Sequence, residues 1–453
     1  MGQLASNDSL RQSTLLDLVL FRMATTSMPA TVIGQGGPQG DLGPSEFRHT
    51  LLQALSSIPS RSSVLAIVAD ETRDDNTFLL FPLAAEILSA KNLKSFDVLI
   101  AQGTHAPMSD SSKRRKLGVG LGLSLGVGHV FDHAWMEASK LTRIGKLHVD
   151  QLKQITGGLI DVPVDLKINA LLAPGLYDTV LIFGTTMPHE VAGFSGGAKY
   201  FFPGVAGPEL THASHWLGAL AGIEKTIGRV ETPTRHLFEA AADLIAATVI
   251  SLNSVVTRQD GRLRTHALFC NDLRSALRKA AEVSKFVHIK YTGRKYTRVV
   301  ALLEPHLNDL WVGGKASYRL GPVIEEGGEL IIYAPHIRDI SDVHGDLIKR
   351  YGYAPIEVVR ELVNHSDDLR NNLCVAAHLA HVSFAGRRSN DGSIVPRYAI
   401  HLCSSIDPAT CRQVNLGYMD PSTFQKTLYS NDPDTLVVEQ AGRDLYLIDP
   451  INQ

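Results

Sequence analysis

Short apolar runs alternate with helical and polar stretches along most of this chain of 453 residues. Three short, predominantly apolar runs bounded by turn residues are typical of strands: 63–69, 96–101 and 177–183. Segments with helical spacing at 48–58 and 82–92 precede and follow the first of them. Strands without a polar face are buried on both sides, as in a parallel sheet covered by helices. The pattern therefore predicts an α/β fold built from strand–helix–strand units.

The same rhythm continues through the rest of the chain and divides it in two. Further helices are expected at 234–247 and 276–286, and further strands at 248–256, 297–303, 329–333, 381–384 and 398–402. We therefore predict two α/β domains with parallel-type sheets and an active-site cleft between them. The first domain is expected to cover residues 1–290, joined by the C-terminal run 437–453, and the second to cover 291–436.

Three stretches carry weaker patterns. Residues 13–22 have helical spacing, and the Gly/Pro-rich residues 34–44 are typical of a connection. The glycine-dense residues 117–128 contain G-x-G-x-G, but no strand precedes them, which favours a flexible loop over a dinucleotide site. Met1-Gly2 formally fits an N-myristoylation pattern, which we attribute to chance because no polybasic segment follows.

Composition narrows the classes of function. With 44% hydrophobic and 20% charged residues the chain is typical of a globular protein, and its net charge of −2 gives no reason to expect nucleic acid as a partner. No apolar run approaches the roughly 20 residues of a membrane-spanning helix, and no signal peptide is evident, so we expect a cytoplasmic protein without a membrane partner. The four cysteines lack CxxC spacing, which favours free buried thiols.

Polar side chains follow three of the predicted strands. Asp70 and Arg73, in the motif Asp-x-Thr-Arg, offer a carboxylate and a guanidinium that can bind an anionic ligand or form a structural ion pair. His105 and His189 follow two other strands and are candidates for acid–base chemistry, or structural histidines. Because the carboxyl ends of parallel strands share one edge of a sheet, we expect these groups to lie close together.

Residues 184–216 combine glycines, one lysine and several histidines. In Phe194-Ser-Gly-Gly-Ala-Lys199 the glycines would let the backbone approach a ligand closely, although a tight turn with a solvated lysine is the alternative. His212 and His215 have the one-turn spacing of a metal-binding pair, although capping or surface positions would also explain them.

Taken together, these motifs resemble the lactate racemase (LarA) family of nickel-pincer-nucleotide enzymes. The motifs that carry the resemblance are Asp70-x-Thr-Arg73, Gly103-Thr-His105, His189, Gly193-Phe-Ser-Gly-Gly-Ala-Lys199, Pro203-Gly204, His215 and Lys315. The resemblance implies two α/β domains with the active site between them. It also implies a cofactor, pyridinium-3-thioamide-5-thiocarboxylic acid mononucleotide, whose two sulfur-containing arms hold Ni(II).

The resemblance implies which residues hold that cofactor. Lys199 would be linked to it through a thioamide, and His215 would supply a further nickel ligand, consistent with the preference of Ni(II) for tetragonal sites. We further expect Thr72, or the amides near Gly196 and Gly197, to bind the cofactor phosphate.

The implied activity is inversion at C2 of a 2-hydroxy acid, as a racemase or epimerase. Removing the C2 hydrogen as a proton is hard, because the adjacent carboxylate stabilises a carbanion poorly; reversible hydride transfer to the cofactor avoids this. His105 and His189 would be the acid/base pair on opposite sides of the substrate. Asp70, Arg73 and Lys315 would orient the substrate.

One position departs from lactate racemase proper, which has a glutamine where this chain has Val312. The second half also carries His336, His344, His378 and His381, which either line a pocket or are buried structural histidines. We expect a 2-hydroxy acid substrate that is larger or more polar than lactate.

Two other classes of function remain as alternatives. A zinc hydrolase could use His212, His215 and Glu190, with an open position for water on the metal. A non-catalytic protein could capture a small anion in the cleft. The zinc alternative leaves Lys199 and the histidines after the strands without roles.

Overall fold

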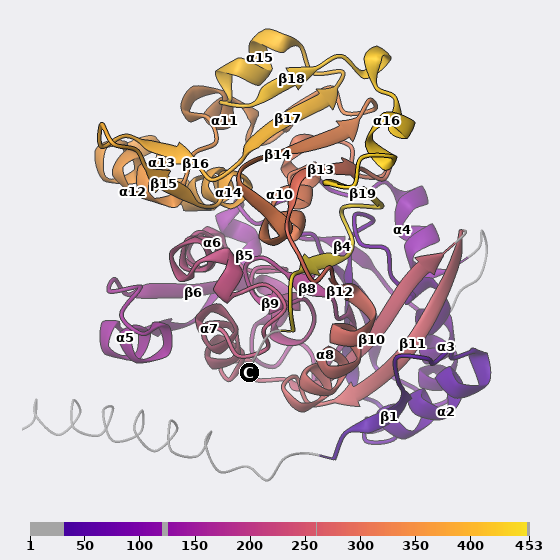
Figure 1. The fold of residues 1–453 in the computed structure, drawn as a ribbon. Coiled ribbons are helices and arrows are strands. Elements are labelled where there is room, and N and C mark those ends of the chain that lie inside the picture. Colours follow the sequence, from indigo (N-terminus) through magenta and orange to yellow (C-terminus); the bar gives the residue numbers. More distant parts are fainter. Residues whose placement is uncertain (1–30, 120–125, 260, 451–453) are drawn as a thin grey trace, which may run out of the picture.

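The computed structural model describes residues 31–119, 126–259 and 261–450. The helix expected at 13–22, the Met1-Gly2 pattern and residues 120–125 of the predicted loop lie outside these ranges. Figure 1 shows two lobes: the first lobe, indigo to pink, comprises the elements up to α8, and the second lobe, orange and yellow, comprises β13 to β19. The chain is therefore a two-lobed α/β protein.

A seven-stranded sheet forms the centre of the first lobe, in the order β1-β11-β10-β7-β2-β3-β4. Its strands are β1 (Ile33–Gly36), β2 (Ser63–Ala69), β3 (Ser95–Ala101), β4 (Val130–Asp132), β7 (Thr179–Thr185), β10 (Thr248–Gln259) and β11 (Arg262–Asn271). The strands from β10 to β4 run parallel, as predicted. β11 and β1 form an antiparallel edge, so the expected connection at 34–44 begins as a strand.

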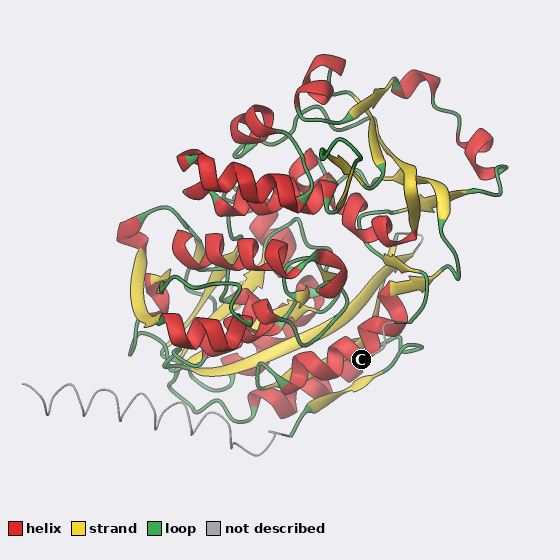
Figure 2. Cartoon of the chain, turned by 60° about the vertical axis from the view of Figure 1, so that its left-hand side comes forward, coloured by secondary structure: helices red, strands yellow, loops and turns green. Residues whose placement is uncertain are grey.

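Helices cover both faces of this sheet (Figure 2). They are α2 (Pro44–Leu55), α3 (Thr77–Ser89), α4 (Asp110–Leu117), α5 (Val149–Thr156), α6 (Pro208–Ala221), α7 (Pro233–Ala242) and α8 (Ser275–His288). Along β2, Leu65 packs in one core with Leu237 of α7, while Val64 packs in the opposite core with Phe81 of α3. Because successive side chains point to opposite faces, both sets must be apolar, which explains the uninterrupted apolar runs in the sequence.

The second lobe contains a five-stranded parallel sheet in the order β18-β17-β14-β13-β19. Its strands are β13 (Tyr296–Leu302), β14 (Ile324–Ala334), β17 (Ala399–Ser404), β18 (Gly417–Met419) and β19 (Thr435–Glu439). Its helices are α9 (Leu310–Gly313), α10 (Lys315–Leu320), α11 (Gly345–Tyr351), α12 (Ile356–His365), α13 (Asp367–Arg370), α14 (Leu373–Ser383), α15 (Pro408–Gln413) and α16 (Lys426–Ser430).

One sequence prediction for the second half is wrong. Residues 381–384 are not a strand but the end of α14, whose residues from Cys374 to Ser383 are all buried, so that no helical period of polar positions marks it. The joining of the C-terminal run 437–453 to the first domain stays a prediction. Its first residues lie in β19, which pairs with β13 of the second sheet. After it, β20 (Leu445–Leu447) pairs with β12 (Ile289–Tyr291), the strand that follows α8.

Three short antiparallel pairs complete the described strands: β5 (Leu141–Leu147) with β6 (Val164–Asn169), β8 (Pro188–His189) with β9 (Gly193–Phe194), and β15 (Gly386–Arg388) with β16 (Ile394–Pro396). The division of the chain into domains at residue 290 stays a prediction. Within the described ranges, no helix is both long and apolar enough to cross a membrane. The four cysteines, Cys270, Cys374, Cys403 and Cys411, are buried and free, as expected.

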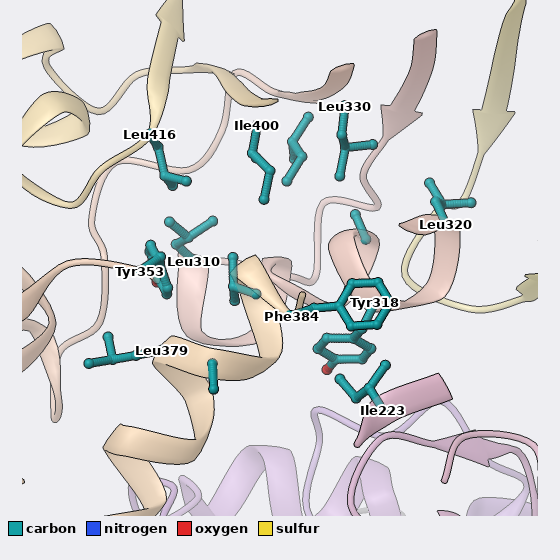
Figure 3. Packing of buried hydrophobic residues seen from close by; sticks show 14 of the residues in the cluster. Ile223, Leu310, Tyr318, Leu320, Leu330, Tyr353, Leu379, Phe384, Ile400 and Leu416 are labelled. Atoms are coloured by element: carbon teal, nitrogen blue, oxygen red, sulfur yellow. The ribbon is translucent and has the colours of Figure 1, made fainter. Parts of the chain in front are cut away.

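The two lobes share an apolar contact. Ile223, which follows α6 of the first lobe, belongs to the core cluster of the second lobe together with Tyr318 and Phe384 (Figure 3). Helix α14 packs against α6, which brings the second lobe over the helix that carries His215. The residues that follow the strands of the first sheet therefore face residues from α9, α10 and α14.

Candidate active site between the two lobes

Most of the site residues expected from the sequence line one cavity of about 130 Å³ at the junction of the lobes. The strands β7, β2 and β3 are neighbours and parallel, so the loops that follow them leave the same edge of the sheet. The expected residues that line this cavity, called the first cavity below, are Asp70, Arg73, His105, His189, Gly196, Lys199, His215 and Lys315.

Asp70 and His105 form a hydrogen-bonded pair across two strand ends. The Asp70 Oδ2 atom lies 2.6 Å from His105 Nδ1, and its Oδ1 atom accepts hydrogen bonds from the Thr72 amide and hydroxyl, at 3.1 and 2.6 Å. Burial opposes the charge of Asp70, but the contacts with His105, Arg73 and Thr72 hold its pKa below the ordinary value. The charged carboxylate accepts the Nδ1 proton of His105, which leaves His105 Nε2 with a lone pair.

His189 is held differently. Its Nδ1 atom accepts a hydrogen bond from the Val191 amide at 3.1 Å, so the neutral ring carries its proton on Nε2. Burial lowers the pKa of His189 well below the ordinary value, and nearby cations reinforce this against the charge of Glu190. The nearest Glu190 carboxylate oxygen lies 3.5 Å from the same Nδ1 atom.

Glycines and one buried arginine shape the loop that carries Lys199. Gly196 has φ of +94°, and a Cβ atom there would lie 2.8 Å from the Asn253 side-chain oxygen and 2.9 Å from Thr186 Oγ1. Only glycine fits that backbone conformation and space. Arg235, which is fully buried, donates hydrogen bonds to the carbonyls of Gly196 and Phe194. Contacts within the first lobe therefore hold this loop in place.

Lys199, in the 3-10 helix η3 (Gly197–Tyr200), and Lys315, in α10, approach the cavity from opposite lobes. Burial and the Arg73 guanidinium lower the pKa of each amine to about 7. A large fraction of each amine is therefore neutral near neutral pH, and a neutral amine is the nucleophilic form.

His215 and His212, one turn apart on α6, are held in opposite tautomers. His215 Nδ1–H donates to the Thr211 carbonyl at 2.7 Å, which leaves Nε2 with a lone pair at the first cavity. His212 Nδ1 instead accepts from the Cys374 amide at 3.3 Å, so its neutral ring has no lone pair on Nε2. Metal-binding histidines characteristically donate their other N–H to a carbonyl, as His215 does.

This difference also bears on the zinc alternative. In the part of the chain that the structure describes, no three His, Cys, Asp or Glu side chains gather as a metal-binding set. The expected trio of His212, His215 and Glu190 is not such a set, because His212 faces Cys374 and the ring of Trp135. The donor set does not support a zinc hydrolase.

The second lobe closes the cavity with Trp311, Val312, His378 and His381. His378 lies against the Trp311 ring, with 4.2 Å between the centroids. His381 Nε2 is buried and has no hydrogen-bond partner among the described residues.

The other two histidines of the second half do not border this cavity. The His344 ring also contacts the Trp311 ring, in a tilted arrangement with centroids 4.2 Å apart. His336 donates from Nε2 to the Leu307 carbonyl at 3.1 Å. Only His378 and His381 of the expected four therefore reach the site.

A second cavity of about 470 Å³ adjoins the first and shares Arg73, His189, Glu190 and Lys315 with it. Two of its buried polar atoms, Thr186 Oγ1 and Arg319 Nε, have no hydrogen-bond partner among the described residues. Buried donors left without partners are rare in folded proteins, so these two atoms are available to a polar ligand.

Two groups expected to bind the cofactor phosphate, the Gly197 amide and Thr72, already donate hydrogen bonds within the protein. The Gly197 amide already donates to the Asn253 side chain at 3.0 Å, and Thr72 donates to Asp70 from both its amide and its hydroxyl. Gly196 lines the first cavity, and Thr72 lines the second. Neither the Gly197 amide nor the Thr72 donors are free for an anion.

Sequence reasoning missed several residues of the site. Glu190 was considered only as a zinc ligand, yet it lines both cavities, and Tyr318 and Trp311 line the first. A signal was present for two of them, because Glu190 follows His189 directly and Tyr318 lies three positions after Lys315 in one helix.

Comparisons with known proteins agree with this fold. The family model of the lactate racemase N-terminal domain matches residues 52–228. A Thermotoga maritima protein, whose crystal structure was determined by a structural genomics consortium, is 31% identical, with a TM-score of 0.83 over 90% of this chain and 99% of that chain. The lactate racemase apoprotein from Thermoanaerobacterium thermosaccharolyticum shares the fold, with a TM-score of 0.66 and 17% identity over 92% of this chain and all of that chain.

A search of curated proteins found no match to this chain. The match to the Thermotoga maritima protein, at 31% identity, covers nearly all of both chains. Together with the family model, it defines the class of protein. The chain belongs to the lactate racemase family.

Proposed function

We propose that this protein is a racemase or epimerase that inverts C2 of a 2-hydroxy acid, using a nickel-pincer nucleotide. The observation that carries the proposal is the gathering at one cavity of a buried lysine with a lowered pKa, an imidazole with a free Nε2 and two further histidines. Lys199 is the residue for covalent attachment, His215 for nickel, and His105 and His189 for proton transfer.

The chain's own groups suit the substrate side of such a reaction. Arg73 and Lys315 can neutralise the substrate carboxylate, and Lys315 gains charge as an anion enters, because a nearby negative charge raises the pKa of an amine. His105 Nε2, whose lone pair is fixed by the Asp70 contact, can accept the proton of the C2 hydroxyl. His189 performs the matching proton transfer for the opposite isomer.

The two cavities fit a cofactor of this kind. The His215 lone pair at the first cavity is a suitable nickel ligand, and Lys199 lies in the same cavity. The second cavity offers unpaired donors from Thr186 and Arg319, which suit the ribose and phosphate of a mononucleotide better than the Gly197 amide does. When bound, the cofactor would accept the C2 hydrogen as hydride and return it to either face of the planar 2-oxo acid.

Attachment provides the direct test of the proposal. After expression with the cofactor-synthesis enzymes, the intact mass of the wild-type protein should include a nucleotide adduct, accompanied by nickel. Lys199→Ala should remove the adduct, whereas Lys315→Ala should retain it, although both lysines are buried and have a pKa lowered to about 7. An adduct that persists in Lys199→Ala would reassign the attachment, and zinc without any adduct would contradict the proposed chemistry.

The walls of the first cavity support a substrate that is more polar than lactate. Val312 can only pack against a ligand, whereas His381 Nε2 is buried without a partner and needs a polar group. A ligand hydroxyl or carboxylate beyond C2 would satisfy that atom.

We therefore expect a longer 2-hydroxy acid with additional hydroxyl or carboxylate groups to be preferred over lactate. The measurement is relative kcat/KM of the cofactor-loaded enzyme across a 2-hydroxy acid series. His381→Leu should reduce this preference by roughly 5- to 150-fold, because a lost buried hydrogen bond costs about 1–3 kcal/mol. A series in which lactate ranks first would refute the expectation.

A further inference from the structure

The two histidines of the proposed acid/base pair are supported in chemically different ways. His105 Nδ1 faces the charged Asp70 carboxylate at 2.6 Å, so the ring can gain or lose a proton at Nε2 while Nδ1–H stays bonded. His189 Nδ1 accepts from the Val191 amide at 3.1 Å, so its neutral ring already carries hydrogen on Nε2. In that tautomer His189 cannot accept a proton at Nε2.

Proton transfer by His189 therefore needs a second arrangement of its ring. To accept a proton at Nε2, or to release one from the imidazolium, the ring must carry hydrogen on Nδ1 as well or instead. The Val191 N–H would then face another N–H, and the hydrogen bond between them would be lost. The Nδ1–H group needs a different acceptor within reach.

Glu190 supplies that acceptor. Its Oε2 atom lies 3.5 Å from His189 Nδ1, slightly beyond hydrogen-bond distance, so a small rotation of either side chain would close the contact. Both side chains are mostly buried, with exposed fractions of 12% for His189 and 16% for Glu190, so water competes weakly for the pair. Glu190 borders both cavities, beside the imidazole it would serve.

We propose that Glu190 is a positioning residue that accepts the Nδ1–H of His189 during turnover, as Asp70 does for His105. The inference rests on the proposed function of the site, because it assigns Glu190 a part in the same proton transfers. The two isomers of the substrate are then served by two dyads, His105 with Asp70 and His189 with Glu190. In the resting protein only the first dyad is closed.

The charges around the second dyad are compatible with this role. His189 is faced by Glu190, Lys199, Arg73 and Arg319, and burial together with these cations lowers its pKa. Glu190 is the one anion in that set, and its charge opposes the lowering.

Glu190 itself stays charged. Burial raises the pKa of Glu190. His189, a backbone hydrogen bond, His381 and Lys315 together lower it by more, so the net shift is downward. Burial raises the pKa of the Tyr318 hydroxyl, and the negative charge of Glu190 raises it further. The carboxylate is therefore available as an acceptor at neutral pH.

Glu190→Gln tests the proposal, because it retains the size of the side chain and removes the charge. In the loaded enzyme we expect kcat to fall by about 10- to 100-fold in both directions, the cost typical of losing the partner that orients a metal-binding histidine, with KM nearly unchanged. Glu190→Asp should recover part of the loss. Glu224→Gln, which removes a carboxylate from a surface ion pair with Arg397, should leave kcat unchanged.

A second readout separates positioning from a merely structural role. In protein labelled with ¹⁵N-histidine, the ring signals of His189, assigned with a His189→Gln variant, report tautomer and ionisation without cofactor or substrate. Glu190→Gln should lower the pKa of His189 relative to wild type, and Glu224→Gln should not. Unchanged kcat and unchanged His189 ionisation in Glu190→Gln would overturn the proposal, whereas a loaded wild-type enzyme that inverts no 2-hydroxy acid would instead refute the proposed function.

Discussion

His105→Ala and His189→Ala are each expected to lower kcat/KM by roughly 10²–10⁴-fold, the usual contribution of general acid–base catalysis, in both directions of the reaction. Each histidine is the base for one isomer and the acid for the other, so kcat/KM should fall in both directions of the reaction. Racemisation of each pure enantiomer by the cofactor-loaded variants, followed by chiral chromatography, is the measurement. The nickel and adduct content should stay at the wild-type level.

His236→Ala is the matched control, because that exposed histidine pairs with Glu231 on the surface and borders neither cavity. It should retain full activity. A loss below about tenfold in His105→Ala or His189→Ala, well under the range for acid–base catalysis, would remove that histidine from the proposed mechanism.

His215→Ala should release nickel, which is the second large effect. Loss of a group that merely orients a metal ligand costs about 10- to 100-fold in metal affinity, so loss of the ligand itself should cost at least as much. Nickel per protein chain after gel filtration is the measurement, with the mass adduct on Lys199 expected to remain. Activity should disappear along with the metal.

His212→Ala provides the comparison for this variant, since it removes an imidazole one turn away that is held in the other tautomer. Nickel retention in His212→Ala should match wild type. Equal losses in the two variants would indicate that α6 had been disturbed, and full retention in His215→Ala would exclude His215 as the ligand.

The central parallel strands of the two large sheets could be predicted because burial on both faces leaves a largely apolar run. Residues 63–69 were predicted as a strand with the bounds that β2 has in the structure. Helix α14 was mistaken in part for a strand at 381–384 for the same reason: it is buried all round, and an apolar run without period does not distinguish the two states. Strand β1 was missed because its glycines indicate a turn.

The site could be predicted where it follows from topology. Asp70, His105 and His189 lie after neighbouring parallel strands, and parallel strands deliver their loops to one edge. The tautomers of His189 and His212 could not be predicted, because each depends on one amide, of Val191 and of Cys374 respectively. No spacing in the sequence encodes those contacts.

Because the first cavity lies between the lobes, each lobe contributes a different set of residues to the site. The residues proposed for attachment, nickel and proton transfer all lie within residues 52–228, the segment that matches the family model, and Arg235 fixes their loop from the first lobe alone. Val312 and His381, which border the first cavity and which we propose to select the substrate, belong to the second lobe. On the proposed function, substitutions in α9 and α14 would alter substrate preference without touching the residues proposed to hold the cofactor. Substrate preference and cofactor attachment would then be separable by lobe, and exchange of the second lobe alone would be enough to change the first of these.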